Sequence, residues 1–399
     1  MAKLLKYFLY TLFLPFWWVQ RLIPRQKNIC VFGAWNGHRY SDNSKYLYLY
    51  VREHHPEINA IWITREEKIK EKVLAVGGLA FLTKDFRGIY YCLLAKNVFL
   101  TSGKRDVNYL AINGANCVQL WHGSPLKKIG LDDRFSDSNT YFQTKIVAHL
   151  YPFLTEFNID YILSNAQVFT DKMASSFNMP IAKVLETGCP RNDAFYSKEQ
   201  DPYNVALRSR FVGCRLIYYM PTFRGHGKSK SLFTLPDFNL ESVLAFLEAN
   251  NLVFISKGHY VDNSLLEKNP DPKSRLIDLE DKDVNEINFM LKDADLLITD
   301  YSSAYFDFLL TEKPLIFAAF DLDEYLAGSR EMYFNYEDVV AGPIVKNWTA
   351  LMASLETIWD DQNFSRLVKE KNALFNKYHD ADNCKRVFEA LQNRSMNTF

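Results

Sequence analysis

The sequence predicts an α/β protein made of two successive Rossmann-like domains that face each other across a cleft. Short apolar runs alternate with helical stretches, which is typical of βαβ units around a parallel sheet. A polar break at residues 197–203, which contains Pro202, interrupts this alternation before it starts again. A length of 399 residues also suits two domains better than one.

In the first half, strands are expected at residues 28–34, 60–64, 97–101, 117–121 and 161–163, with helices at 43–53 and 66–75. In the second half, strands are expected at 216–219, 252–256, 275–277, 296–299 and 315–318, with helices at 240–249, 284–291 and 303–310. A last helix at about 383–392 is expected to cross back to the first half. The predicted parts are therefore residues 1–26, 27–200, 201–380 and 381–399.

The charge and cysteine content argue against nucleic-acid binding and for buried thiols. The formal net charge is zero, so there is no general basic excess of the kind that nucleic-acid binding needs. The six cysteines include no C-x-x-C pair, and most lie in apolar runs. Buried free thiols in a reducing compartment are therefore expected.

The N-terminal residues 4–23 are strongly apolar and aromatic, but the charge-free core spans only residues 7–19. This is shorter than a bilayer span, and Pro15 is expected to break or kink a helix there. Basic residues flank the stretch, and Trp17 and Trp18 favour the headgroup layer. We interpret residues 1–26 as an interfacial anchor on the cytoplasmic leaflet. A signal peptide is not expected, because no cleavage site of small residues follows the stretch. A docking segment that is buried against the protein stays an alternative.

The loop after the strand at 117–121 carries unusual chemistry. It reads LWHGSPLKKIG and contains His122, Gly123, Ser124 and Lys127. Ligands of open parallel sheets bind beyond the carboxyl ends of the strands, and a histidine there can accept a proton near neutral pH. The alternative is a strand-end histidine that only hydrogen-bonds the backbone.

Further loops repeat this pattern. Arg191 either faces an acceptor or pairs with a carboxylate. Arg224 is either a phosphate ligand or a surface arginine in a basic loop. Ser302 and Ser303 can cap a helix whose N-terminus attracts an anion. The D-x-D-E-Y segment at 321–325 suggests a divalent metal, a nucleotide ribose, or merely a solvated acidic loop.

Several segments, in order, resemble those of the CDP-glycerol glycerophosphotransferase family, which includes wall teichoic acid primases and polymerases and capsule enzymes. They are WHGSPLKKIG at 121–130, GCPRND at 188–193, YMPTFR at 219–224, KGH at 257–259, ITDYSS at 298–303 with DLDEY at 321–325, and GP at 342–343. The resemblance spans residues 118–345 and implies a GT-B architecture, with the donor mainly on the C-terminal domain. Residues 1–115 show no such motif.

The resemblance also implies roles for individual residues. His122 matches the family's catalytic base, and His259, which is also expected to be catalytic, matches a histidine that contacts the donor pyrophosphate. The donor phosphates would be bound by Arg224, His259, Ser302 and Ser303, and the ribose by Asp323 and Glu324. Gly123, Ser124, Lys127, Arg191 and Asp300 are expected at the acceptor or along the cleft. No cofactor is implied with certainty, and a need for a divalent metal stays open.

The expected activity is transfer of glycerol phosphate from CDP-glycerol to a hydroxyl of a lipid-linked glycan or a glycerol-phosphate polymer, with release of CMP. The enzyme would act peripherally at the cytoplasmic face of the membrane, and the chain length favours single addition over polymerisation. Three alternatives stay open: a CDP-ribitol-dependent transferase, a GT-B glycosyltransferase that uses a nucleotide sugar, and a non-enzymatic membrane scaffold with a decayed nucleotide cleft.

Overall fold

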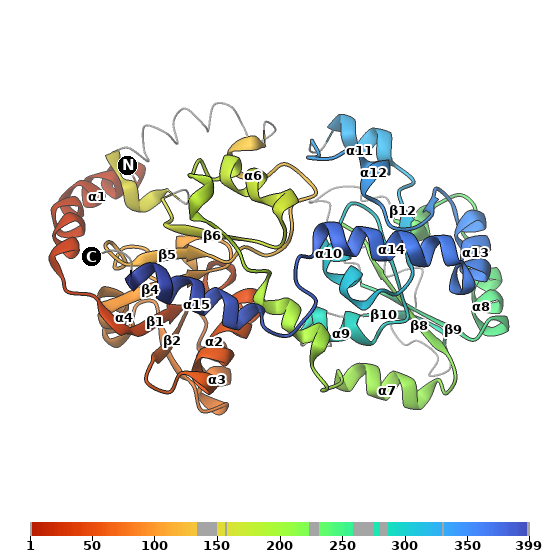
Figure 1. Ribbon diagram of the computed structural model, residues 1–399, viewed down its shortest axis with the longest axis horizontal. Helices are drawn as coiled ribbons and strands as arrows, with labels where there is room; N and C mark the ends of the chain where they lie inside the picture. The colour runs from red at the N-terminus through yellow and green to blue at the C-terminus, as the bar shows by residue number, and fades with distance from the viewer. Residues whose placement is uncertain are drawn as a thin grey trace. The chain divides into compact units, whose positions relative to one another are not determined.

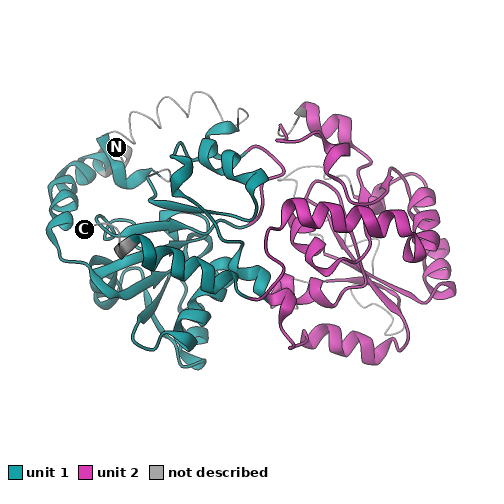
Figure 2. Ribbon diagram, viewed as in Figure 1, with its two compact units in different colours: residues 1–122, 129–193, 382–399 teal, residues 123–128, 194–381 magenta. Residues whose placement is uncertain are grey.

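A computed structural model describes residues 2–133, 150–155, 158–222, 231–257, 274–279, 286–328 and 331–396. The chain forms two compact units (Figure 2). Unit 1 consists of Met1–His122, Ile129–Asp193 and Asp382–Phe399, and unit 2 of Gly123–Lys128 and Ala194–Ala381. Each unit has its own parallel sheet, so the predicted α/β class is confirmed.

Unit 1 contains a seven-stranded sheet in the order β3-β2-β1-β4-β5-β6-β7 (Figure 1). Its strands are β1 Gln26–Phe32, β2 Asn59–Thr64, β3 Leu79–Leu82, β4 Ala95–Leu100, β5 Asn116–Gln119, β6 Tyr161–Ser164 and β7 Val184–Glu186. All neighbouring strands pair in parallel. The strand order reverses between β1 and β4, and such a switch point opens a crevice beyond the carboxyl ends of the strands.

Successive residues of a strand point to opposite faces of the sheet, so both faces present apolar side chains, and helices cover both. Cys30 and Phe32 lie in one apolar cluster with side chains of α2 and α15, whereas Ile29 and Val31 lie in the other with side chains of α4 and α6. The helices of unit 1 are α1 Ala2–Val19, α2 Asp42–His54, α3 Glu67–Ala75, α4 Phe86–Leu94, α6 Gln167–Ser176 and α15 Asn383–Met396.

Unit 2 contains a six-stranded parallel sheet in the order β10-β9-β8-β11-β12-β13. Its strands are β8 Arg215–Met220, β9 Leu252–Ser256, β10 Leu276–Asp278, β11 Leu296–Thr299, β12 Leu315–Ala318 and β13 Ile344–Val345. Its helices are α7 Pro202–Arg210, α8 Leu240–Ala249, α9 Ile287–Asp293, α10 Ala304–Phe308, α11 Leu322–Gly328, α12 Tyr336–Val339, α13 Trp348–Thr357 and α14 Gln362–Phe375. This is the strand order of dinucleotide-binding sheets.

The segment Gly123–Lys128 belongs to unit 2, although the sequence places it within a domain of residues 27–200. Its backbone pairs with a later part of unit 2: Lys127 and Met332 form an antiparallel bridge, and the N–H of Lys128 donates to the carbonyl of Glu331 at 2.8 Å. The N–H of Tyr333 donates to the carbonyl of Leu126 at 3.0 Å. A pairing over about two hundred residues cannot be read from local sequence patterns.

Of the break or kink expected at Pro15, the break is wrong, because helix α1 runs through this residue. One side of the helix packs against unit 1: the rings of Tyr10, Phe13 and Trp17 lie 5.3–5.9 Å from the ring of Phe153. These contacts fall on both sides of Pro15 and support both halves of the helix. No helix among the described residues is both long enough and apolar enough to cross a membrane.

The predicted burial of the cysteines is confirmed, since all six are buried and none forms a disulfide. Desolvation raises the pKa of Cys30 to about 12, so this thiol stays protonated at neutral pH.

Helix α15 returns to unit 1 and is fastened there by Asp193. The carboxylate of Asp193 accepts hydrogen bonds from the backbone N–H of Asn383 at 2.9 Å, from the Asn383 side chain at 2.7 Å and from the N–H of Cys384 at 2.9 Å. Asp193 therefore satisfies the first donors of a helix that begins 190 residues later.

Replacing Asp193 tests this connection. Asp193→Ala should lower the free energy of unfolding by about 1–2 kcal/mol, the usual cost of losing a helix cap, and Asp193→Asn by less because it keeps one acceptor oxygen. Urea unfolding followed by circular dichroism measures the difference. Asp171→Ala, an exposed aspartate on α6, is the control and should change stability by less than about 0.5 kcal/mol. Equal stability of Asp193→Ala and the control would contradict this role.

Candidate active site

His122 lies just beyond the carboxyl end of β5, where the backbone turns sharply. Trp121 has a φ of 58° and Gly123 a φ of 150°, so left-handed backbone lies on both sides of the histidine. The imidazole stacks on the indole of Trp121 at a centroid distance of 4.2 Å and lies 5.2 Å from the ring of Trp35. Two aromatic rings therefore fix the plane of the imidazole.

The tautomer of His122 follows from one hydrogen bond. Its Nδ1 lies 3.2 Å from the backbone carbonyl oxygen of Thr101, which can only accept. Nδ1 therefore carries the proton, and Nε2 presents a lone pair. Burial lowers the pKa of His122, and the nearby Asp42 carboxylate partly opposes this shift. The ring is neutral at pH 7 and suited to accept a proton.

A buried ion pair supports the loop of His122. Nη1 of Arg191 lies 3.0 Å from the carboxylate of Asp42 and donates to the backbone carbonyl of His122 at 2.8 Å. Both Arg191 and Asp42 are 8% exposed. Of the two roles considered for Arg191, the pairing with a carboxylate is the one that the structure shows.

The N-terminus of α2 ties these loops together. The side-chain amide of Asn43 donates to the carbonyls of Leu120 and Trp121 at 3.1 and 2.9 Å, and its oxygen accepts the N–H of Arg191 at 3.0 Å. Ser44 bonds the hydroxyl of Thr101 at 2.8 Å. The N-terminal end of α2 thus fixes the positions of the loops that follow β4, β5 and β7.

Backbone strain is concentrated in the same place. Trp35, Asn36, Asp42 and Trp121 are non-glycine residues with φ between 51° and 65°, and all four follow β1 or β5. Each such residue costs about 1–3 kcal/mol and persists only where its surroundings enforce it, most often at functional sites.

A second buried carboxylate organises the loops after β1 and β4. Asp106 accepts the N–H groups of Asn36 at 2.6 Å, Thr101 at 2.7 Å, Ser102 at 2.7 Å and Gly103 at 3.3 Å. Burial raises the pKa of Asp106 to about 6, although these bonds favour the charged form. Asp106 therefore sets the position of the Thr101 carbonyl, which in turn orients His122.

In unit 2, Asp300 joins two strand-end loops. Its Oδ1 accepts the N–H and the hydroxyl of Thr222, which follows β8, both at 2.7 Å. It also accepts the N–H of Tyr301 at 2.5 Å, and the hydroxyl of Tyr336 donates to its backbone carbonyl at 2.9 Å. Asp300 was expected at the acceptor or the cleft; its contacts show that it holds the loops after β8 and β11 together.

The serines that follow Asp300 are partly exposed at the start of α10. Ser302 Oγ accepts the N–H of Ala304 at 3.4 Å, whereas Ser303 has helical backbone angles and makes no capping bond. Of the two expected caps, only Ser302 acts as one.

The loop after β12 is held by aromatic stacking. The rings of Tyr301 and Tyr325 stack at 4.2 Å, and the Tyr301 hydroxyl donates to Asp321 at 3.0 Å. Burial, with the Asp321 charge, raises the pKa of Tyr301. Asp323 and Glu324 are exposed in the first turn of α11. Within the described ranges, no three His, Cys, Asp or Glu side chains gather in a way that could hold a metal ion.

Three residues expected at the acceptor or cleft, Gly123, Ser124 and Lys127, lie in unit 2. The Lys127 ammonium lies 5.8 Å from the centre of the Tyr325 ring, next to α11. Lys128 forms an ion pair with Glu331. The basic part of the WHGSPLKKIG segment is therefore built into the same unit as Asp300 and Ser302.

The glycine of the GP segment is needed for packing. A Cβ on Gly342 would lie 1.9 Å from the carbonyl oxygen of Leu315, and the N–H of Phe317 donates to the carbonyl of Pro343 at 2.9 Å. Gly342 thus permits the close approach of β12 and β13.

Arg224 and His259 lie outside the described residues, so their expected roles at the donor phosphates stay predictions. The residues that sequence reasoning missed are Trp35, Asp42, Thr101 and Asp106. The same rule that found His122 could have found Trp35 and Thr101, because both follow strand ends. Nothing in the sequence links Asp42 to Arg191, 149 positions away.

Comparison with known proteins identifies the family. Residues 16–393 match the model of the family described as CDP-Glycerol:Poly(glycerophosphate) glycerophosphotransferase. The chain is 28% identical to the teichoic acid glycerol-phosphate transferase of Staphylococcus aureus, over 94% of each protein. It is 26% identical to the teichoic acid ribitol-phosphate primase of Bacillus spizizenii, over 93% of this chain and 92% of that protein.

Among solved structures, that of the wall teichoic acid polymerase TagF has the same fold, with a TM-score of 0.73 at 24% identity over 93% of this chain and 90% of that one. Since the family match covers nearly the whole sequence, the chain belongs to the CDP-glycerol glycerophosphotransferase family and is an enzyme that transfers glycerol phosphate from CDP-glycerol.

Proposed function

We propose that this enzyme transfers glycerol phosphate to a hydroxyl of a lipid-linked glycan or glycerol-phosphate polymer in teichoic acid synthesis, with His122 as general base. The observation that carries the proposal is the orientation of His122, whose Nδ1 faces the Thr101 carbonyl so that Nε2 is the proton acceptor. The similarity to a glycerol-phosphate transferase over the full length of both proteins supports the reaction class.

In the proposed step, the acceptor hydroxyl oxygen attacks the β-phosphorus of CDP-glycerol. Nε2 of His122 takes the hydroxyl proton as the new P–O bond forms. The bond between the β-phosphorus and the bridging oxygen breaks, and CMP leaves with the electron pair. A neutral imidazole is required at the start, which agrees with the lowered pKa of His122.

The donor is proposed to bind unit 2, where Ser302 and Ser303 contact its phosphates and Asp323 and Glu324 its ribose. Both serines are accessible at the carboxyl end of β11, and both carboxylates are exposed on α11. Carboxylates accept hydrogen bonds from ribose hydroxyls. Arg224 and His259 are retained in the proposal as phosphate ligands on the strength of the sequence resemblance.

We also propose that α1 lies in the membrane interface at the cytoplasmic face. Its outer side is an apolar stripe at helical spacing, formed by Leu5, Phe8, Leu9, Leu12 and Phe16, each 51–62% exposed. Such a stripe beside flanking basic and tryptophan residues is typical of helices that lie in the headgroup layer. A peripheral enzyme there would meet both a water-soluble nucleotide donor and a lipid-linked acceptor.

CMP release by the purified full-length chain tests the donor and the acceptor. With CDP-glycerol we expect release in the presence of a lipid-linked disaccharide or of a glycerol-phosphate oligomer, and the faster of the two identifies the acceptor. CDP-ribitol is the matched donor, because the chain also resembles a ribitol-phosphate primase along its length. Release with CDP-ribitol alone, or with a nucleotide sugar alone, would overturn the assignment of the donor.

His122→Ala should lower kcat by about 10²–10⁴-fold, because general-base catalysis contributes about that much. Steady-state CMP release by folded protein measures the change. His54→Ala removes an exposed histidine of α2 and should keep wild-type turnover. If His122→Ala retains near-wild-type kcat, His122 is not the base.

Replacing either partner of the buried ion pair should shift the acid limb of the pH profile of kcat/KM, and the two replacements should shift it in opposite directions. The active form of His122 is neutral, so activity rises with pH through its pKa, which burial lowers from the ordinary histidine value. Asp42→Asn removes a negative charge that raises this pKa, so the acid limb should move to lower pH. Arg191→Met removes a positive charge that lowers it, so the limb should move to higher pH.

Arg191→Met also leaves Asp42 buried without its partner and should cost about 3–5 kcal/mol of stability, so folding is confirmed by thermal unfolding. Limbs that stay in place or move in the same direction in both variants would disprove the coupling.

A further inference from the structure

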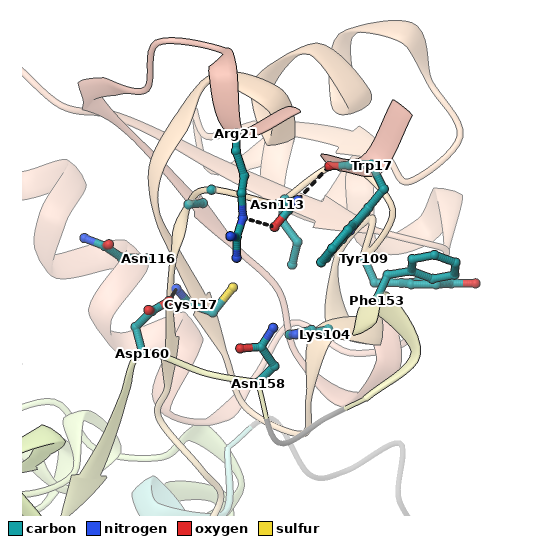
Figure 3. Close-up of a pocket in the computed structure, with 13 residues that line it drawn as sticks. Trp17, Arg21, Lys104, Tyr109, Asn113, Asn116, Cys117, Phe153, Asn158 and Asp160 are labelled. Carbon is teal, nitrogen blue, oxygen red and sulfur yellow. Dashed lines mark hydrogen bonds between the residues drawn. The ribbon is translucent and has the colours of Figure 1, made fainter. Parts of the chain in front are cut away.

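Unit 1 contains a cavity of about 340 Å³ that the transfer reaction does not use (Figure 3). Trp17 of α1 and Arg21 of the 3₁₀ turn Gln20–Leu22 line one side. The other walls come from residues between 104 and 117, in the connection from β4 to β5 and the start of β5, and from Phe153, Asn158 and Asp160 before β6. The cavity thus lies at the amino ends of β5 and β6, whereas His122 follows the carboxyl end of β5.

Polar groups from separate segments converge in this cavity. Figure 3 shows the guanidinium of Arg21, the nitrogen end of Lys104 and the carboxamide of Asn158 pointing into the same space. Lys104 is only 5% exposed, and a buried ammonium is costly unless polar or anionic groups surround it. The cavity is therefore built around cations.

The position of Arg21 is fixed by Asn113. The amide of Asn113 donates to the carbonyl of Trp17 at 2.6 Å, and its oxygen accepts Nε of Arg21 at 3.4 Å. Among the lining residues that the structure describes, Asp160 is the only carboxylate, and it accepts the N–H of Cys117 at 2.8 Å. Two cations, Arg21 and Lys104, against this one carboxylate give the described part of the lining a net positive charge, which favours a phosphate-bearing ligand.

The same stretch of chain that lines the cavity carries the outward apolar stripe. Phe16, Trp18 and Leu22 are 51%, 45% and 80% exposed, and the Arg21 guanidinium lies 4.9 Å from the Trp18 ring centre. One short segment therefore carries both exposed apolar side chains and a cation that lines the cavity. A molecule that joins acyl chains to a phosphate matches both.

We propose that this cavity binds the phosphate of an anionic phospholipid headgroup while the outer side of α1 contacts the acyl region. The inference rests on the proposed membrane association of α1 and adds a site with preference for a headgroup. It gives the enzyme a fixed attachment point on the sheet edge opposite His122.

Sedimentation of the full-length chain with vesicles tests the proposal, using vesicles of phosphatidylcholine alone and vesicles that also contain phosphatidylglycerol. Wild type should prefer the anionic vesicles. Arg21→Gln and Lys104→Gln should each reduce binding to the anionic vesicles by about fivefold, the usual effect of one basic residue at a membrane surface. Asn158→Asp should do the same by adding a negative charge. Lys72→Gln, on α3 beside β2 and β3, removes an equal charge away from the cavity and should bind like wild type.

Leu12→Glu separates the two proposals, because it should weaken binding to both kinds of vesicle through the apolar stripe. If wild type binds neither kind, both membrane proposals fail, while the CMP-release assay with a soluble acceptor still tests the transferase. If wild type binds but shows no anionic preference, or if the cavity variants keep it as Lys72→Gln does, the headgroup site is wrong. Arg21 and Asn158 are exposed, so their variants decide the question even if Lys104→Gln unfolds.

Discussion

The ion pair between Asp42 and Arg191 is the interaction on which the geometry of the candidate site depends. It joins the start of α2 to the loop after β7, and the same guanidinium holds the backbone of His122. Breaking it would release the start of α2 and the loops that follow β5 and β7. The first two are strained, since Asp42 and Trp121 both have left-handed backbone. The packing of the buried sheet thus offsets the strain of the loops that hold His122 in one orientation.

In both units, a buried carboxylate binds backbone N–H groups of the loops at one edge of the sheet. Parallel strands bring several loops to one edge, and those loops have backbone donors without sheet partners. In unit 1, Asp106 collects four such N–H groups, and in unit 2 Asp300 collects two N–H groups and the hydroxyl of Thr222. A buried carboxylate at the sheet edge fixes loop positions with few residues and leaves side chains such as His122 and Ser302 accessible to substrates.

Local patterns sufficed for much of the fold. The longer apolar runs, such as those of β1, β2 and β8, are strands as expected. The four-residue β3 and the two-residue β13 are not among the expected strands, because such short runs carry little periodic signal. His122 could be singled out because it follows a strand directly. Asp42 could not, because its partner is far along the chain, and the tie between Asp193 and α15 depends on an equally distant contact.

The proline in α1 shows a different limit. Pro15 removes one helical hydrogen bond, which argues for a break when the segment is considered alone. Aromatic contacts with Phe153 on both sides of the proline outweigh that loss. Tertiary packing, which the sequence does not display, therefore decides the local structure.

The return of α15 has a consequence for synthesis on the ribosome. Val387, Phe388 and Leu391 pack on a face of the first sheet that α2 also covers, so the part of that face under α15 stays exposed until this helix has left the exit tunnel. The pairing of Leu126 and Lys128 with Glu331 and Tyr333 likewise waits for most of the second unit. The second unit, made almost entirely of one continuous stretch, can thus complete its core while the first is still waiting for its final helix, in reverse of the order of translation.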